Sequence, residues 1–329
     1  MISFPKPMER RHFRAWRSDP QLWLPIAIDI AKGLSLPREH VEVFSNGTNL
    51  VVGLGGAFVL KIYPPFLRHQ HFSERTTLPL LKGRVSAAIP EVIAEGERDG
   101  WPYLVISRLH GELGTNVWPS LPEDQKEGVL RQIGQTIAEV QSAPLGDLAS
   151  LKPEWFDFLQ AQIANCRSRH IGLGLPAKFL NELDDLISEA SALIPVDGPS
   201  VILTGEYIPE NFLLTSRDAR WELSGIIDFG DVMTGWREYD LLGPSAFMTA
   251  GRSGRVRGLL QGFGYLKEDM SPALGRRLLA LMFLHRASDP LKHICIPGWE
   301  HEVRTLSELQ QMLWPFDQLP HPEKPAEGT

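Results

Sequence analysis

The chain has 329 residues, of which 43% are hydrophobic and 22% charged, so it can bury a sizeable core in one large domain or two lobes. Its formal net charge of −7 gives no electrostatic reason to expect a nucleic acid or an anionic membrane as a partner. The first residues have no apolar core of signal-peptide length and no apolar run reaches about 18 residues, which predicts a cytoplasmic protein.

The first 110 residues predict one helix followed by strands. Asp19 as a capping candidate, the proline after it and a closing Gly33 predict a single helix over residues 16–33. Alternating apolar residues predict three strands between residues 41 and 63. The loop between the first two could cradle phosphates with its backbone N–H groups, although a loop with one glycine is more often an ordinary hairpin turn. This loop consists of Ser45, Asn46, Gly47, Thr48 and Asn49.

Lys61 interrupts the apolar residues of the third predicted strand. A single lysine in a strand usually faces solvent at an edge or on an outer face. Thirteen residues later, Glu74 begins a segment in which Leu78 and Leu81 recur at helical spacing, so a helix with one apolar face is expected there. From these residues alone, Lys61 either faces outward or pairs with the glutamate of that helix.

The pattern changes near Gly111. Before it, residues 88–109 predict two strands about a turn at residues 98–100; after it, apolar residues recur at helical spacing. We therefore expect an N-terminal lobe of residues 1–110, a C-terminal lobe of residues 111–320 and a mobile polar tail of residues 321–329. The expected helices are residues 123–142, 155–171, 177–193, 274–285 and 306–314.

Two further groups of residues have an ordinary interpretation. The two cysteines, Cys166 and Cys295, form neither a disulfide framework nor a zinc spacing, so we expect buried free thiols. The helix over residues 177–193 carries several acidic side chains, for which a solvated face is favoured over contact with a polyhydroxylated or cationic substrate. These acids are Glu182, Asp184, Asp185 and Glu189.

The stretch over residues 201–240 contains the strongest chemical pattern. An apolar strand, a polar loop and two apolar runs separated by a turn predict a hairpin folded about Ala219 and Arg220. Such a hairpin places Asn211 and Asp228 opposite each other at its open end. One amide and one carboxylate supply the hard oxygen ligands that Mg²⁺ takes alongside water and nucleotide phosphates. Glu206, five residues before Asn211, lies on the loop that faces whatever the metal holds.

This order of residues resembles a known catalytic segment. An acid, four residues and an asparagine, followed by a hairpin and D-F-G at residues 228–230, resembles protein-kinase-like phosphotransferases. The preceding glycine, Pro209, I-D-F-G-D and the later Tyr239–Asp240 pair are more similar to the aminoglycoside phosphotransferase branch, whose loop is usually H-G-D. Here Thr204 replaces the histidine and Glu206 replaces the aspartate.

The similarity extends over nearly the whole chain. The N-G-T-N loop, W-P-Y-L-V-I-S-R-L-H-G, I-G-Q-T-I-A-E-V-Q-S-A-P and L-S-E-L-Q-Q-M-L-W-P resemble, in order, antibiotic kinases of the hygromycin 7''-phosphotransferase type. The T-G-E-Y loop is also similar to phosphotransferase domains found beside JmjC-type domains. The resemblance implies an α+β, bilobal protein-kinase-like fold with a small β-rich N-lobe and a larger, mainly helical C-lobe. Fold alone does not fix the substrate.

The resemblance also implies a reaction and roles for the candidate residues. It implies transfer of the γ-phosphoryl group of ATP (or GTP), with Mg²⁺, to a hydroxyl of an aminoglycoside, a nucleoside antibiotic or a sugar-like metabolite. Lys61 would bind phosphate oxygens and Glu74 would orient Lys61. Glu206 would accept or orient the hydroxyl proton, and Asp240 would brace the catalytic loop. Asn211 and Asp228 would hold the metal, and backbone groups of Ser107 to Leu109 would pair with the base.

A pseudokinase that binds a nucleotide or acts as a scaffold is the alternative. Only the substitutions at Thr204 and Glu206 favour it, whereas the residues expected to bind phosphate and metal are all present. Lys61→Ala is expected to leave the fold nearly intact, because neither Lys61 nor Glu74 is expected in the core. The residues do not indicate an oligomeric state.

Overall fold

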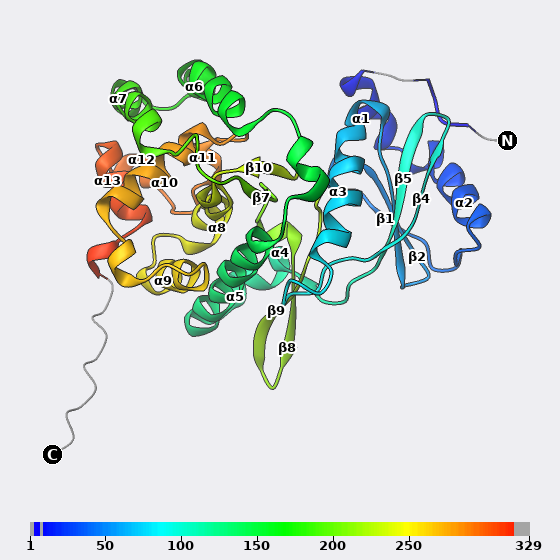
Figure 1. The fold of residues 1–329 in the computed structure, drawn as a ribbon. Helices are drawn as coiled ribbons and strands as arrows, with labels where there is room; N and C mark the ends of the chain where they lie inside the picture. Colours follow the sequence, from blue (N-terminus) through cyan, green and yellow to red (C-terminus); the bar gives the residue numbers. More distant parts are fainter. Residues whose placement is uncertain (1–2, 7–8, 319–329) are drawn as a thin grey trace.

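The computed structural model describes residues 3–6 and 9–318. Its N-terminal part contains an antiparallel sheet of five strands in the order β1-β2-β3-β5-β4 (Figure 1). The strands and turns expected from the sequence are confirmed. They are β1 (Glu42–Phe44), β2 (Leu50–Leu54), β3 (Phe58–Ile62), β4 (Val92–Arg98) and β5 (Trp101–Ser107).

The two faces of this sheet are covered by different helices. The helix α2 (Leu24–Gly33) packs on one face, and α3 (Arg68–Leu81) packs on the other (Figure 1). Side chains alternate between the faces of a strand. Leu60 and Ile62 of β3 join the core beneath α2, so Lys61 between them points to the α3 side. The β3 alternation therefore decides between the two orientations that the sequence left open.

The expected single helix over residues 16–33 is wrong, because the chain forms two helices with a bend between them. Helix α1 (Arg10–Arg17) ends before Asp19, whose side chain accepts a hydrogen bond from the Gln21 backbone and starts a short 3₁₀ turn. The indole of Trp23 is buried and donates to the carbonyl oxygen of Arg17 at 2.9 Å. Burial of this indole fixes the bend, and α2 begins anew at Leu24 with proline in its first turn.

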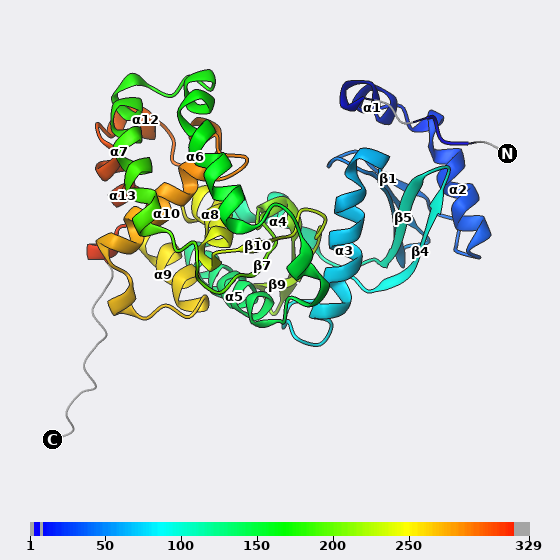
Figure 2. The same cartoon turned by 45° about the horizontal axis from the view of Figure 1, so that its top comes forward.

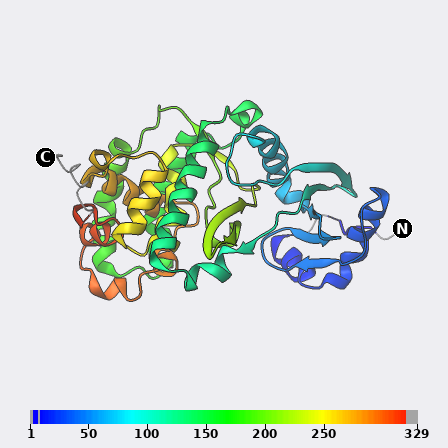
Figure 3. The same cartoon turned by 90° about the horizontal axis from the view of Figure 1, so that it is seen from below.

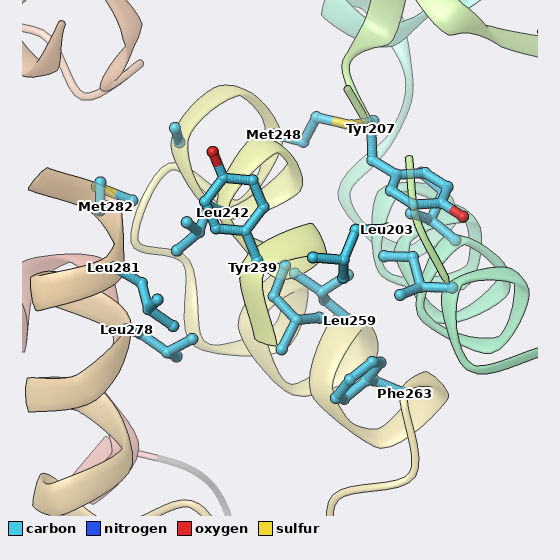
Figure 4. Packing of buried hydrophobic residues seen from close by; sticks show 14 of the residues in the cluster. Leu203, Tyr207, Tyr239, Leu242, Met248, Leu259, Phe263, Leu278, Leu281 and Met282 are labelled. Atoms are coloured by element: carbon cyan, nitrogen blue, oxygen red, sulfur yellow. The ribbon is translucent and has the colours of Figure 1, made fainter. Parts of the chain in front are cut away.

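The remainder of the chain is mainly helical and gathers on the far side of α3 from the five-stranded sheet (Figures 2 and 3). The expected helices are present, with ends that differ by at most two residues. They are α5 (Glu123–Ser142), α6 (Trp155–Gly172), α7 (Ala177–Leu193), α10 (Pro272–Leu284) and α13 (Leu306–Leu313). Leu278, Leu281 and Met282 of α10 pack beside Leu242 and Tyr239 in the core (Figure 4).

Helix α9 (Ser253–Gly262) is not among the helices expected from the sequence, and it contains several glycines. These glycines allow α9 to cross α5 at close range. A Cβ atom at Gly134 of α5 would lie 2.1 Å from the carbonyl oxygen of Leu259, and one at Gly262 would lie 2.0 Å from that of Arg131. Glycine is a weak helix former, but at positions 134 and 262 any side chain would clash with the backbone of the other helix.

Two small sheets flank the candidate residues Glu206, Asn211 and Asp228. Strand β7 (Val201–Leu203) pairs with β10 (Met233–Gly235), and β8 (Phe212–Arg217) pairs with β9 (Arg220–Ile226) and with β6 (Glu112–Leu113). The β8–β9 hairpin turns at Asp218 and Ala219, which both have positive φ. This turn lies one residue earlier than expected.

Other expectations concern single segments. Cys166 is buried as expected, but Cys295 is exposed. No helix within the described residues is long and apolar enough to cross a membrane. The tail expected to be mobile lies outside the described residues.

Candidate active site

Lys61 lies at the centre of a charge cluster with the buried Glu74 and the half-buried Asp228. Its Nζ is 2.5 Å from Glu74 Oε2 and 3.0 Å from Asp228 Oδ1. Burial alone would lower the pKa of Lys61, but the carboxylates of Asp228 and Glu74 outweigh it and raise this pKa above its usual value. Lys61 is therefore a cation held between the sheet, helix α3 and the D-F-G segment.

Glu74 is fixed by a second contact. Its side chain has no exposed surface, and its Oε2 also accepts a hydrogen bond from the hydroxyl of Tyr63 at 2.6 Å. The positive charge of Lys61 is the main reason that the pKa of Asp228 lies below its usual value. Lysine, glutamate and aspartate thus form a chain that links the sheet to the hairpin.

The loop after β7 joins Glu206 to Asn211. The backbone carbonyl of Glu206 accepts a hydrogen bond from the Asn211 side-chain nitrogen at 3.0 Å, and also one from the Ile208 backbone at 2.9 Å. The Ile227 N–H donates to the carbonyl oxygen of Asn211 at 3.0 Å, which places Asn211 beside Asp228 as the hairpin argument expects. Glu206, Asn211 and Asp228 line one small cavity.

Asn211 and Asp228 fit a magnesium ion by their free oxygen atoms. Asp228 Oδ1 is used by Lys61 and, at 3.4 Å, by the Gly230 N–H. Within the described residues, neither Asp228 Oδ2 nor Asn211 Oδ1 makes a hydrogen bond. One carboxylate and one amide oxygen match the donors that Mg²⁺ accepts when phosphates and water complete its shell. Asp228 also has φ +67, a strained conformation of the kind that occurs at functional sites.

Glu206 lies in an acidic environment. Burial, followed by the nearby charges of Asp231 and Asp228, raises the pKa of Glu206 to about 7. Arg286, whose Nη2 is 4.0 Å from Glu206 Oε1, partly opposes this effect. The carboxyl of Glu206 is therefore poised near neutral pH, which is the range in which a proton acceptor works best.

The catalytic loop, which follows β7, is held in place by Asp240, as expected from the sequence. His285 and Arg286 also contact this loop, which was not expected. The carboxylate of Asp240 accepts hydrogen bonds from the backbone of Thr204 at 3.1 Å and Gly205 at 2.8 Å. Its neighbour Tyr239 stacks on His285 with ring centroids 4.6 Å apart, and His285 also bonds the Gly205 backbone. His285 and Arg286 follow the end of α10, where the sequence gives no sign that they reach a loop eighty residues earlier.

Asp240→Ala is expected to loosen the loop, because the amides of Thr204 and Gly205 would lose their acceptor in a buried place. We expect a loss of about 1–3 kcal/mol in the free energy of unfolding, the usual penalty for unpaired buried polar groups. Urea denaturation measures it. Asp240→Asn keeps one acceptor oxygen and should lose less; equal losses in the two variants would contradict the bracing role.

The other candidate nucleotide contacts lie at two loops. Residues 45–49 join β1 to β2, and Gly47 takes a positive φ of 90 there. At the other site, the N–H of Ser107 donates to Glu91 and that of Arg108 donates to Ala57, each at 2.8 Å. These two N–H groups are used within the sheet, so they are not free to pair with a base. The expected pairing through the backbone C=O groups of this segment stays a prediction. Leu109 can offer its N–H to a base, because its backbone makes no hydrogen bond within the described residues.

A buried strand lysine paired with a helix glutamate, an acid-bearing loop that ends in asparagine and the aspartate of D-F-G together define a kinase-like phosphotransferase. A family model described as the phosphotransferase enzyme family matches residues 38–275. The chain therefore belongs to this family. Membership places the protein among kinases that phosphorylate an alcohol group.

Solved structures share the fold of this chain. The GDP complex of aminoglycoside 2'-phosphotransferase-IIIa has a TM-score of 0.66 and 18% sequence identity, covering 89% of this chain and 99% of that chain. The streptomycin–ATP complex of APH(2")-IIa has a TM-score of 0.55 and 17% identity, covering 79% and 87%. The macrolide 2'-phosphotransferase MphH from Brachybacterium faecium has a TM-score of 0.54 and 16% identity, covering 81% and 99%. The α+β, bilobal kinase-like fold expected from the sequence is thus confirmed.

Proposed function

We propose that the protein transfers the γ-phosphoryl group of ATP or GTP to a hydroxyl of a small molecule. The observation that supports this most strongly is the position of Lys61, 2.5 Å from Glu74 and 3.0 Å from Asp228. Similar folds have been solved with GDP, with ATP and with the aminoglycosides kanamycin and streptomycin. An aminoglycoside, a nucleoside antibiotic or a sugar-like metabolite is the acceptor class we propose.

In this reaction the acceptor oxygen forms a bond to the γ-phosphorus, and the bond to the bridging oxygen of the nucleoside diphosphate breaks. Asn211 and Asp228 would hold Mg²⁺, which neutralises phosphate charge when bound. Lys61 would bind phosphate oxygens, with Glu74 fixing its direction. Glu206 would take the proton that the hydroxyl releases. Positioning and charge neutralisation provide most of the rate enhancement in such a reaction.

A panel assay tests the proposal. Purified protein with Mg·ATP or Mg·GTP is incubated with aminoglycosides, nucleoside antibiotics and sugar metabolites, and the products are analysed by mass spectrometry. We expect one acceptor class to gain the mass of one phosphoryl group, with equal formation of nucleoside diphosphate. Nucleotide binding without any phosphorylated product would instead support the pseudokinase. The observation in favour of that alternative is that Glu206 stands where the family usually has aspartate.

The kcat/KM for the acceptor should depend on the ionisation of Glu206. Because its pKa is raised to about 7, the carboxylate that accepts a proton is present above this pH and is lost as the pH falls through it. Well below the pKa, kcat/KM should fall about tenfold per pH unit. Mg²⁺ at Asp228 would remove part of the repulsion, so the midpoint in the loaded enzyme should lie somewhat lower.

A pH–rate profile with saturating Mg·ATP checks this expectation. Asp231→Asn removes one of the charges that raise the Glu206 pKa, so its acid limb should move to lower pH. A wild-type profile that stays flat through the acid range would contradict proton acceptance by Glu206.

A further inference from the structure

A polar contact that the proposed reaction does not use lies one helical turn from Glu74. Gln70 precedes Glu74 by four residues on α3, so both side chains share one face of the helix. The Gln70 side chain is buried. Its Oε1 accepts hydrogen bonds from Asn49 Nδ2 at 3.0 Å and from Thr48 Oγ1 at 3.4 Å, and its Nε2 donates to Asp231 Oδ2 at 3.0 Å. One amide thus joins the 45–49 loop to the residue after D-F-G.

The direction of these hydrogen bonds is fixed by chemistry. A carboxylate oxygen of Asp231 accepts from the nitrogen of Gln70, so the oxygen of Gln70 faces the loop. The backbone at Gly230 also allows α3 to lie close to the D-F-G-D segment. Gly230 has no side chain, and a Cβ atom there would lie 3.3 Å from the Cβ of Gln70. The glycine of D-F-G therefore leaves room for α3 to approach this segment.

Asp231 is also held from its other side. Arg286 Nη2 donates to the backbone carbonyl of Asp231 at 3.2 Å and lies 3.7 Å from its Oδ1. The same Nη2 is 4.0 Å from Glu206 Oε1. A continuous set of polar contacts consequently runs from the 45–49 loop through Gln70, Asp231 and Arg286 to the catalytic loop.

We propose that Gln70 is a positioning residue that holds the 45–49 loop against the D-F-G-D segment before the nucleotide binds. This deepens the proposed function, because the nucleotide phosphates are the ligand that would lie between these segments. Helix α3 is tied to D-F-G-D twice, once through Glu74 and Lys61 to Asp228 and once through Gln70 to Asp231. Because both contacts already hold these segments together, binding of the phosphates has to order less of the 45–49 loop and the D-F-G-D segment.

The loss of this contact should weaken nucleotide binding. Ordering a free loop and its side chains on binding reduces affinity, and an interaction worth about 1.4 kcal/mol corresponds to a tenfold change in Kd. Gln70→Glu keeps an acceptor for Asn49 and Thr48 but sets a carboxylate against Asp231. We expect its Kd for Mg·ATP, measured by calorimetry, to rise about tenfold, because the repulsion separates α3 from D-F-G-D.

A reciprocal exchange makes the test specific. In the double variant Gln70→Glu with Asp231→Asn, the new asparagine donates to the new glutamate, so donor and acceptor have exchanged places. Its Kd should return to near the wild-type value. Asp231→Asn alone keeps one acceptor oxygen for Gln70 Nε2, so it should weaken binding less than Gln70→Glu does. Arg75→Gln is the matched control. It alters an exposed contact of α3, with Glu95 at 3.3 Å, and should bind Mg·ATP as the wild type does.

Hydrogen exchange at the amides of residues 45–49 gives a second readout that needs neither nucleotide nor turnover. Protection should fall in Gln70→Glu and return in the double variant. Unchanged protection and affinity in Gln70→Glu, or a double variant no better than Gln70→Glu, would overturn the proposal. If the double variant shows the rescue but the wild type phosphorylates no acceptor, this role of Gln70 is supported and the proposed phosphoryl transfer is not.

Discussion

Lys61→Met is expected to abolish phosphoryl transfer and to destabilise the fold. The side chain of Lys61 is only 7% exposed and that of Glu74 is 0% exposed, so the variant leaves a buried carboxylate without its cation. Removing one partner of a buried ion pair costs about 3–5 kcal/mol. The premise from the sequence that neither partner lies in the core is therefore wrong, because both side chains are in the interior. We accordingly replace the expectation of a nearly intact fold.

A second variant separates the loss of stability from the loss of activity. Lys61→Met combined with Glu74→Leu removes both charges of the buried pair. The remaining carboxylate without its cation is that of Asp228, whose side chain is 38% exposed and therefore accessible to water. We expect urea denaturation to show that most of the lost stability returns, with some deficit because Tyr63 loses its acceptor. Transfer should stay absent in the double variant. Wild-type kcat in Lys61→Met at saturating Mg·ATP would remove Lys61 from the site.

The residues that the sequence predicted well are those whose partners are fixed by local geometry. The alternation of β3 aims Lys61 at α3, and the hairpin forces Asn211 and Asp228 together at its open end. Both follow from strand periodicity and from a short turn, which can be inferred from neighbouring residues. The order of the motifs, an acid-bearing loop with asparagine followed by a hairpin and D-F-G, then predicted the kinase-like fold.

The residues that the sequence missed owe their positions to contacts between distant segments. Gln70 reads as an ordinary polar residue of a helix until Asn49 and Asp231 meet it in space. The N–H of Ser107 is occupied because β4 begins beside it, and the carbonyl oxygen of Glu91, just before that strand, accepts it. Pairings of this kind depend on tertiary packing and leave no periodic pattern.

The acidic helix α7 largely agrees with the expectation from the sequence. Its charges were expected to be solvated or to contact a substrate. The solvated face is confirmed for Asp184, Asp185 and Glu189, which are exposed. In addition, Glu182 accepts the backbone N–H of Leu306, Asp184 contacts Arg167 at 2.7 Å and Glu189 contacts Arg276 at 2.9 Å. These acids join α7 to its neighbours, and none of these three contacts involves a residue of the catalytic loop.

Glu206→Gln is expected to remove nearly all transfer while making the protein more stable. The folded-state pKa of Glu206 is raised, so its ionised form costs native stability at neutral and higher pH, and an amide of equal length removes that cost. Partial exposure of the side chain keeps the gain small. An amide cannot accept the hydroxyl proton, so kcat should fall although Mg·ATP still binds.

Glu206→Asp keeps the charge but shortens the side chain by one methylene, which withdraws the carboxylate by about 1.5 Å. A misplacement of about 1 Å can cost on the order of 100-fold in a positioned reaction. The surroundings of the longer acid, with Arg286 Nη2 4.0 Å from its Oε1, fit the carboxylate of glutamate, so aspartate should also lose activity. The decisive measurement compares transfer by wild type, Glu206→Gln and Glu206→Asp with one confirmed acceptor. Full activity in Glu206→Gln would exclude proton acceptance by this residue, whereas activity raised by Glu206→Asp would indicate a site built for the shorter acid.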